Sequence, residues 1–188
     1  MDLKRVAAVL LLMTILLAGC AGKDGQLQRG LALRERLSKQ DCSFTTQITA
    51  VYGELTYTFT VFCTADTKGN LQFSVVTPES IAGISGTLDG SGGRLTFDDK
   101  ALAFSMLADG EVSPVSAPWL LMKTLRSGYI RSCCEEESGL HLSVDDSYED
   151  NPLRLDIWLG AGDVPIFAEV LWQGRRVLSM QIDNFTFV

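Results

Sequence analysis

Apolar and polar residues alternate over 44–50 and again over 55–61, and this period of two constrains the fold more than any other feature. Such alternation is typical of a β-strand with one buried face. Tyr52-Gly53 lies between the two runs, so together they predict a β-hairpin. If Tyr52 and Gly53 form a two-residue loop, Ala50 faces Leu55 and all the large apolar side chains share one face of the hairpin.

The same register places Cys42 opposite Cys63. The two cysteines would then form a non-hydrogen-bonded pair, in which facing side chains approach most closely. This spacing predicts a disulfide between Cys42 and Cys63, which an oxidising compartment permits. Two buried free thiols are the alternative.

The first twenty residues have the form of an export signal. Lys4 and Arg5 precede an uncharged apolar run over 6–17, and the segment ends in Leu-Ala-Gly followed by Cys20. This ending resembles the lipobox of bacterial lipoproteins. The resemblance implies cleavage just before Cys20 and a diacylglycerol, with acyl chains such as palmitate, on the Cys20 sulfur. A plain signal peptide and an uncleaved anchor are the alternatives.

These features predict the organisation of the whole chain. We expect 1–19 to be a lipoprotein signal peptide, 20–25 a lipidated tether, and 26–188 a single domain. The lipid on Cys20 would hold this domain on the extracytoplasmic face of the cell membrane.

The remaining periodicity predicts an α+β domain. A helix is expected over 26–40, with a weak point at Gly30. One face of it should carry Leu27, Leu31, Arg34 and Leu37. A second helix should run over 116–126 and end at Gly128. Further strands are expected at 71–77, 84–89, 94–98, 102–104, 129–136, 139–144, 153–159, 164–172 and 175–187, with a bulge near Asp183-Asn184.

Residues 80–99 are rich in glycine. This stretch fits neither of the glycine motifs that cradle phosphate groups. We therefore expect residues 89–93 to form a turn between short strands.

The order of these segments resembles the LolA/LolB-like lipoprotein-localisation superfamily, in the style of small lipoproteins of Gram-positive Clostridia that include a spore-germination lipoprotein. Besides the lipobox, the resemblance is carried by 71–78, 83–88, 93–98, 116–121 and 182–187. It implies a strongly curved antiparallel half-barrel of eleven strands that covers a few helices. It also implies an apolar concavity, because members of the superfamily carry acyl chains or lipoproteins, while others act as protein partners. Arg94 is nearest in position to the arginine that gates the carrier's cavity.

Seven large apolar residues lie on segments expected to face the inside of such a sheet. They are Trp119, Leu120, Met122, Leu125, Trp158, Phe167 and Trp172. Such residues make either a filled core or an acyl-sized cavity, and the helix that carries the first four would act as a lid.

Few residues of the sequence are candidates for catalysis or metal binding. His141 alternates with Leu140 and Leu142, so we expect it to face solvent on the polar side of a strand. Cys133 and Cys134 are adjacent, and a vicinal disulfide, free thiols and an intermolecular bond all stay open. No second Cys or His pair completes a zinc set, so neither a metal site nor a catalytic residue is expected.

The charge balance excludes one class of function, the binding of nucleic acid. The chain has 16 Lys and Arg against 23 Asp and Glu, and this net charge of −7 excludes electrostatic binding to the phosphates of a nucleic acid. The first hypothesis is a non-enzymatic, lipid-anchored protein that binds an acyl chain or a hydrophobic partner segment in its concavity. The alternative is an envelope protein–protein adaptor with a filled core. No cofactor is expected beyond the lipid on Cys20, and the oligomeric state is left open.

Overall fold

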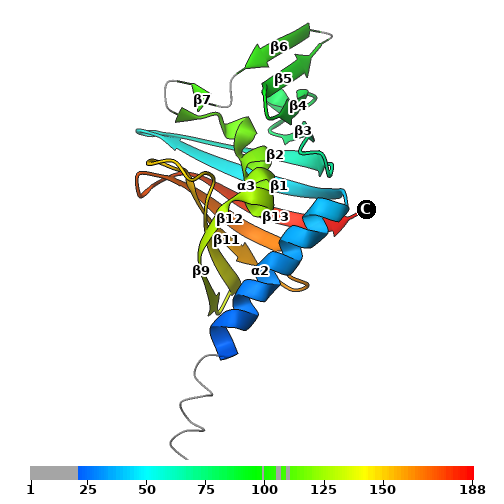
Figure 1. The fold of residues 1–188 in the computed structure, drawn as a ribbon. Helices are drawn as coiled ribbons and strands as arrows, with labels where there is room; N and C mark the ends of the chain where they lie inside the picture. The colour runs from blue at the N-terminus through cyan, green and yellow to red at the C-terminus, as the bar shows by residue number, and fades with distance from the viewer. Residues whose placement is uncertain (1–20, 99, 105–106, 109–110) are drawn as a thin grey trace, which may run out of the picture.

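The computed structural model describes residues 21–98, 100–104, 107–108 and 111–188, which form an open sheet of eleven antiparallel strands with two α-helices on one face (Figure 1). The predicted signal peptide and the predicted lipid attachment at Cys20 lie outside the described residues. Neither described helix is both long and apolar enough to cross a membrane.

The helices are α2 (Ala21–Lys39) and α3 (Ala117–Ser127), and two 3-10 turns are η1 (Glu79–Ile81) and η2 (Pro114–Ser116). The large sheet contains β1 (Cys42–Tyr52), β2 (Leu55–Ala65), β3 (Leu71–Thr77), β4 (Ser85–Asp89), β5 (Gly92–Phe97), β6 (Lys100–Phe104), β9 (Tyr129–Glu136), β10 (Gly139–Asp145), β11 (Arg154–Leu159), β12 (Pro165–Trp172) and β13 (Arg175–Phe187). A short hairpin of β7 (Leu107–Ala108) and β8 (Glu111–Val112) stands apart from it.

The sheet has the order β6-β5-β4-β3-β2-β1-β13-β12-β11-β10-β9. Its two halves therefore meet where the first and last strands pair. The predicted bulge in β13 is confirmed, because the β1–β13 register shifts between Ser43 and Thr45, and Asn184 has a φ of 54°.

The turn of the first hairpin is displaced by one residue from the prediction. Tyr52 faces Leu55, so the two loop residues are Gly53 and Glu54. Gly53 has a φ of 61°, which glycine adopts without steric cost and which suits the first loop position of a tight hairpin. The register is thereby shifted by two residues, which leaves the predicted apolar face intact.

The shift removes the basis of the predicted disulfide. Cys42 faces Ala65 and Cys63 faces Phe44, so the two cysteines are diagonal neighbours across the strand pair. Diagonal neighbours lie roughly 7–8 Å apart, beyond the reach of a disulfide. Both cysteines are buried free thiols. Burial raises the pKa of Cys42 to about 11 and that of Cys63 further.

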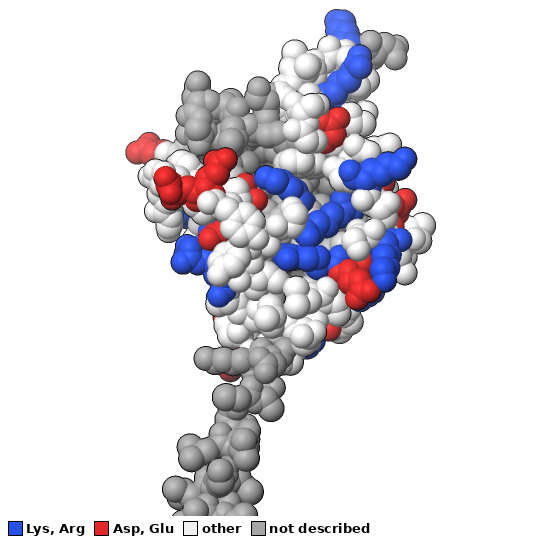
Figure 2. Space-filling view, viewed as in Figure 1, with Lys and Arg blue, Asp and Glu red and all other residues white. Residues whose placement is uncertain are grey.

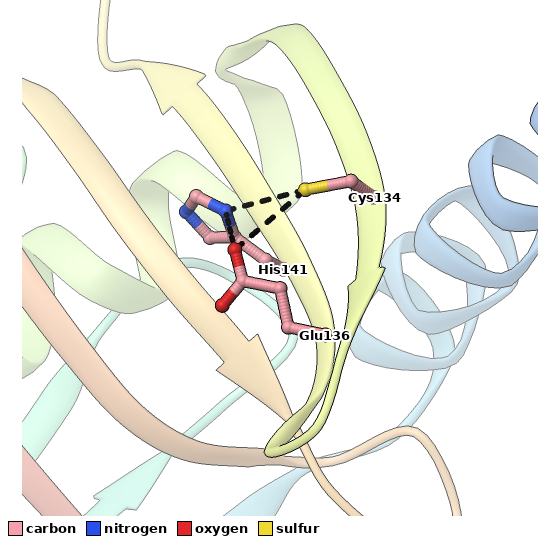
Figure 3. Close-up of side chains that lie close together, drawn as sticks. All are labelled: Cys134, Glu136 and His141. Carbon is pink, nitrogen blue, oxygen red and sulfur yellow. Dashed lines mark hydrogen bonds and ion pairs between the residues drawn. The ribbon is translucent and has the colours of Figure 1, made fainter.

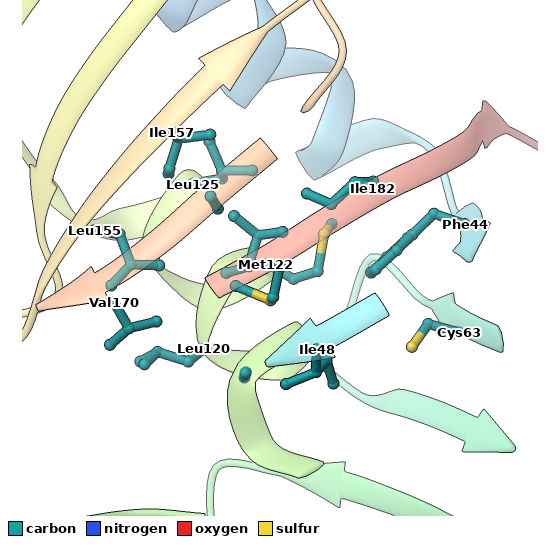
Figure 4. Close-up of a cluster of buried hydrophobic side chains, with 14 of the residues drawn as sticks. Phe44, Ile48, Cys63, Leu120, Met122, Leu125, Leu155, Ile157, Val170 and Ile182 are labelled. Atoms are coloured by element: carbon teal, nitrogen blue, oxygen red, sulfur yellow. The ribbon is translucent and has the colours of Figure 1, made fainter. Parts of the chain in front are cut away.

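The core lies between the sheet and α3 (Figure 4). Leu120, Met122 and Leu125 are at most 5% exposed and share one cluster of buried side chains with Ile48 and Ile157. The second predicted helix is confirmed, but seven of its residues are buried. It is therefore a fixed layer of the core and not the lid that the sequence suggested.

Helix α2 packs through a face that matches the predicted one only in part. Leu37 is buried as predicted, but Leu33 is buried too, whereas Leu27 and Leu31 are exposed. A Cβ added to Gly30 would lie 3.3 Å from Cδ2 of Leu142. Gly30 therefore allows a close approach of the helix to the sheet and is no weak point.

The two helices also stabilise each other's C-terminal ends. Arg34 of α2 donates from Nε to the carbonyl oxygen of Leu125 at 2.9 Å, and Arg126 of α3 donates from Nε to that of Leu37 at 3.2 Å. A guanidinium at these carbonyls complements the negative end of the helix dipole. Figure 2 shows Lys and Arg side chains gathered on this face.

Three glycines of the glycine-rich stretch lie inside strands, Gly86 in β4 and Gly92 and Gly93 in β5. Asp89 faces Gly92, so the loop is shorter than the predicted turn over 89–93. A Cβ at Gly86 would lie 2.7 Å from Cζ of Phe73, and one at Gly93 would meet the ring of Phe104. These glycines give room to aromatic rings that lie flat on the sheet.

Candidate functional site

An apolar pocket of about 360 Å³ opens on the half of the sheet formed by β2 to β5. Its walls are formed by residues of β2, β3, β5, η1 and η2, and by Ile84 just before β4. They include Tyr57, Phe59, Val75, Ile84, Leu95 and Val115. Because Phe59 and Val75 belong to the inward-facing rows of β2 and β3, the pocket lies on the same face as the core. Its volume is in the range of small-molecule binding sites.

Exposed apolar side chains extend from this pocket along the same face. Leu55 and Tyr57 continue the inward-facing row of β2. Phe97 follows Leu95 on β5, and Leu102 of β6 faces Leu95. The four exposed residues are between 51% and 65% exposed. Contiguous exposed apolar residues are typical of surfaces that contact a ligand, a membrane or a partner.

The residues predicted to line the concavity do not line this pocket. Leu120, Met122 and Leu125 belong to the filled core under α3. Trp119 is half-buried, and its Nε1 donates to a main-chain carbonyl in the β2–β3 turn at 2.9 Å. Trp172 is half-buried against the core at the end of β12.

Trp158 and Phe167 lie on the opposite face of the sheet. Trp158 faces His141 on one side and Phe167 on the other. Its ring stacks on His141 with centroids 4.5 Å apart and an angle of 11° between the planes. His141 thus lies on the predicted face, but only 17% of its side chain is exposed because Trp158 covers it.

His141 also belongs to a cluster with Cys134 and Glu136 (Figure 3). Cys134 faces His141 across the β9–β10 pair, and Glu136 lies two residues further along the same face. Nδ1 of His141 lies 3.0 Å from Oε1 of Glu136 and 3.6 Å from Sγ of Cys134. The Sγ–Oε1 distance is 3.7 Å. The sequence predicted no metal site for want of a second Cys or His pair, yet the fold gathers three different potential ligands.

The electrostatics of this cluster disfavour an activated cysteine. Desolvation and the Glu136 carboxylate raise the pKa of Cys134. The hydrogen bond that Trp158 Nε1 donates to Oε2 of Glu136, at 2.8 Å, lowers the pKa of Glu136. A nucleophilic cysteine needs a lowered thiol pKa. The cluster is therefore a poor match for a cysteine hydrolase.

A larger hollow, of about 650 Å³, lies on the outer face of β2 to β5 and is lined largely by hydroxyl and amide side chains. Arg94 belongs to this hollow and faces Thr87 across the β4–β5 pair. The arginine nearest in position to the gating residue of the carrier is thus on the other face from the apolar pocket.

No protein-family model and no curated protein matches the sequence. Several solved structures are similar in fold. An uncharacterized conserved protein from Thermus thermophilus is 11% identical over 86% of this chain and 87% of that chain, with a TM-score of 0.49. A putative outer membrane lipoprotein-sorting protein domain from Vibrio parahaemolyticus is 9% identical over 87% of this chain and 92% of that chain, with a TM-score of 0.47. A LolA superfamily protein from Nitrosomonas europaea is 7% identical over 85% of this chain and 93% of that chain, with a TM-score of 0.44.

The predicted architecture, an antiparallel sheet of eleven strands with two helices, is confirmed by the structure itself. At these identities no residue role is transferred from the similar structures. The site is instead defined by this chain's own residues.

Proposed function

We propose that the protein is a non-enzymatic lipoprotein, anchored through Cys20 on the extracytoplasmic face of the membrane, that binds a fatty acyl chain in the pocket of β2 to β5. The observation that carries the proposal is the apolar lining of this pocket, which includes Tyr57, Phe59 and Leu95. In the same proposal, the sheet curves strongly enough to close a half-barrel around the helices, as the sequence resemblance implies.

The volume of the pocket suits part of an acyl chain. A methylene group occupies about as much space as a water molecule, ~30 Å³, so 360 Å³ holds about twelve of them. At about 0.8 kcal/mol for each buried methylene, the transfer is worth roughly 10 kcal/mol. The loss of translational and rotational freedom costs at least about 4 kcal/mol. The balance favours reversible binding without a covalent step.

The position of the pocket relative to the proposed anchor fits this function. Helix α2 begins at Ala21, directly after Cys20. In Figure 1, the first turn of α2 and strands β5 and β6 lie at opposite ends of the molecule. An acyl chain bound in the pocket would therefore be held away from the anchored end of the protein.

The proposal is tested with a fluorescent fatty acid and the full chain. Tyr57→Asp places a charge in the pocket at a residue that is exposed, so the fold should tolerate it. Phe62→Asp is the matched control, because Phe62 is an exposed aromatic residue of the same strand on the opposite face. We expect saturable binding by the wild type, at least tenfold weaker binding by Tyr57→Asp, and unchanged binding by Phe62→Asp. Absence of saturable binding, or equal losses in both variants, would falsify the proposal.

A protein partner is the second candidate, because the exposed apolar row extends beyond the pocket through Leu55, Phe97 and Leu102. In this case the row contacts an apolar segment of an envelope protein. Crosslinking on whole cells should then recover one stoichiometric partner, which Tyr57→Asp loses and Phe62→Asp keeps. If the fatty acid also binds with the expected pattern, the acyl chain is the better assignment.

A further inference from the structure

The outer face of the β9–β10 hairpin carries a thiol, a carboxylate and an imidazole that converge on one point (Figure 3). We propose that Cys134, Glu136 and His141 bind a divalent zinc-type metal ion through Sγ, Oε1 and Nδ1. This site is independent of the acyl pocket. It uses donor types that zinc prefers, with one soft sulfur, one imidazole nitrogen and one oxygen.

The spacing of the three atoms fits a tetrahedral ion. With a Zn–S bond of about 2.3 Å and Zn–N and Zn–O bonds of about 2.1 Å, the sulfur lies about 3.6 Å from the nitrogen and from the oxygen. The observed Sγ–Nδ1 and Sγ–Oε1 distances are 3.6 and 3.7 Å. The Nδ1–Oε1 distance of 3.0 Å would widen by a few tenths of an ångström. Side-chain rotations of the exposed Glu136 provide that change.

The neighbours of the cluster orient two of the proposed ligands. Nε2 of His141 is buried and makes no hydrogen bond within the described part of the chain, but it lies 3.5 Å from Oδ1 of Asp156. A histidine that binds a metal through Nδ1 carries its proton on Nε2, and a carboxylate at that position fixes the tautomer. Trp158 stacks on the imidazole and donates to the second oxygen of Glu136, so it restrains both ligands.

The charge of the cluster also favours a cation. Among the described residues, neither Glu136 nor Asp156 pairs with a lysine or an arginine, and both have His141 as their ion-pair partner. Binding of the metal would release the thiol proton of Cys134 to solvent, because the thiolate is the ligand. Three protein ligands leave the fourth position for water or an external donor. Cys133 faces Leu142 and points to the other face, so it does not supply that ligand.

The test uses Co²⁺ as the probe, on the reduced and metal-free full chain. Thiolate ligation gives a sulfur-to-cobalt charge-transfer band, which a merely structural role for these residues does not produce. We expect one Co²⁺ per chain, displaced by Zn²⁺. Cys134→Ser should lose the band, and the matched control Cys133→Ser should keep it. His141→Gln and Glu136→Gln should each weaken binding at least tenfold, and Asp156→Asn about tenfold.

Three results would overturn the proposal. The first is no charge-transfer band in the wild type, and the second is a band that survives Cys134→Ser. The third is one Co²⁺ for every two chains, because a single chain would then not complete the site. Far-ultraviolet circular dichroism and the urea midpoint of each variant establish that a lost band reflects lost ligands and not unfolding.

Discussion

Replacement of Gly128 by alanine should destabilise the protein, because this residue lies where α3 ends against β10. A Cβ at position 128 would lie 2.6 Å from the carbonyl oxygen of Asp145 and 2.7 Å from that of Thr124. It would also lie 2.8 Å from Cγ1 of Val144. Two of these three atoms belong to the main chain, so the end of α3 or the strand itself must shift.

The size of the effect follows from two opposing terms. Gly128 has a φ of −68° and a ψ of 164°, which alanine adopts freely, so no backbone strain arises. The lower entropy of the unfolded alanine chain contributes about 0.4–1 kcal/mol of stability. Overpacking costs about 1–3 kcal/mol, and the immobile carbonyls place this position in the upper part of that range. We therefore expect a net loss of about 1–2 kcal/mol, or a Tm lower by roughly 2–8 °C.

Urea unfolding of the full chain measures this change, and the m-value should stay constant because the same surface unfolds. Gly25→Ala is the matched control. Gly25 is exposed on α2, and a Cβ there meets no atom within 4 Å. This variant should gain up to about 1 kcal/mol from helix propensity. A Gly128→Ala protein as stable as the wild type would refute the tight contact between α3 and β10, and with it the conclusion that α3 is a fixed layer.

Two further predictions concern ionisable groups. Although burial raises the pKa of Asp66, hydrogen bonds within the β2–β3 turn and the charge of Arg126 hold it below its ordinary value. The carboxylate therefore contributes stability above pH ~4, which is lost as the pH falls through the lowered pKa. Asp66→Asn should flatten this acid-side loss in urea titrations, and an unchanged pH profile would contradict it. In thiol labelling of the folded chain at neutral pH, Cys134 should react first, and Cys42 and Cys63 only after unfolding, since both are buried with raised pKa values. Early labelling of either would contradict the structure.

The strands and α3 were predictable because their signals are local. Alternation over β1 and β2 depends only on which residues face the core, and the Pro and Gly that bound α3 act within one turn of helix. The register of the first hairpin was not predictable in the same way. Loops at Tyr52-Gly53 and at Gly53-Glu54 both place the same face inward, so periodicity does not choose between them. The predicted disulfide depended on that choice and was wrong.

The apolar surfaces were harder to assign, because some segments are apolar on both faces. In β11, Leu155 and Ile157 face the core, but the next residue after Ile157, Trp158, faces outward. In α2, the helical period allows a stripe through Leu31 or one through Leu33, and only the close approach at Gly30 selects the second. The predicted concavity therefore combined residues of the filled core with residues of the outer face.

The Cys134–His141 pair was missed although its signal lies in the sequence. Glu137-Ser138 separates two predicted strands, and as a two-residue loop it places Cys134 opposite His141. Taken singly, His141 is a histidine on the polar face of a strand and Cys134 is one of two adjacent cysteines, and neither indicates a site by itself. In an antiparallel strand pair, residues directly opposite each other are close in space. Potential metal ligands on one strand must therefore be compared with the residues opposite them on the next strand.

The two proposed sites are physically separate, and this makes their tests independent. The pocket lies on the inward face of β2 to β5, and the cluster lies on the outward face of β9 and β10. Five strand-to-strand steps separate β2 from β10, which is roughly 24 Å at about 4.8 Å per step. Changes this far apart act additively to within about 0.5 kcal/mol. Loss of fatty acid binding in Tyr57→Asp should therefore leave the cobalt site intact, and failure of one proposal leaves the evidence for the other unchanged.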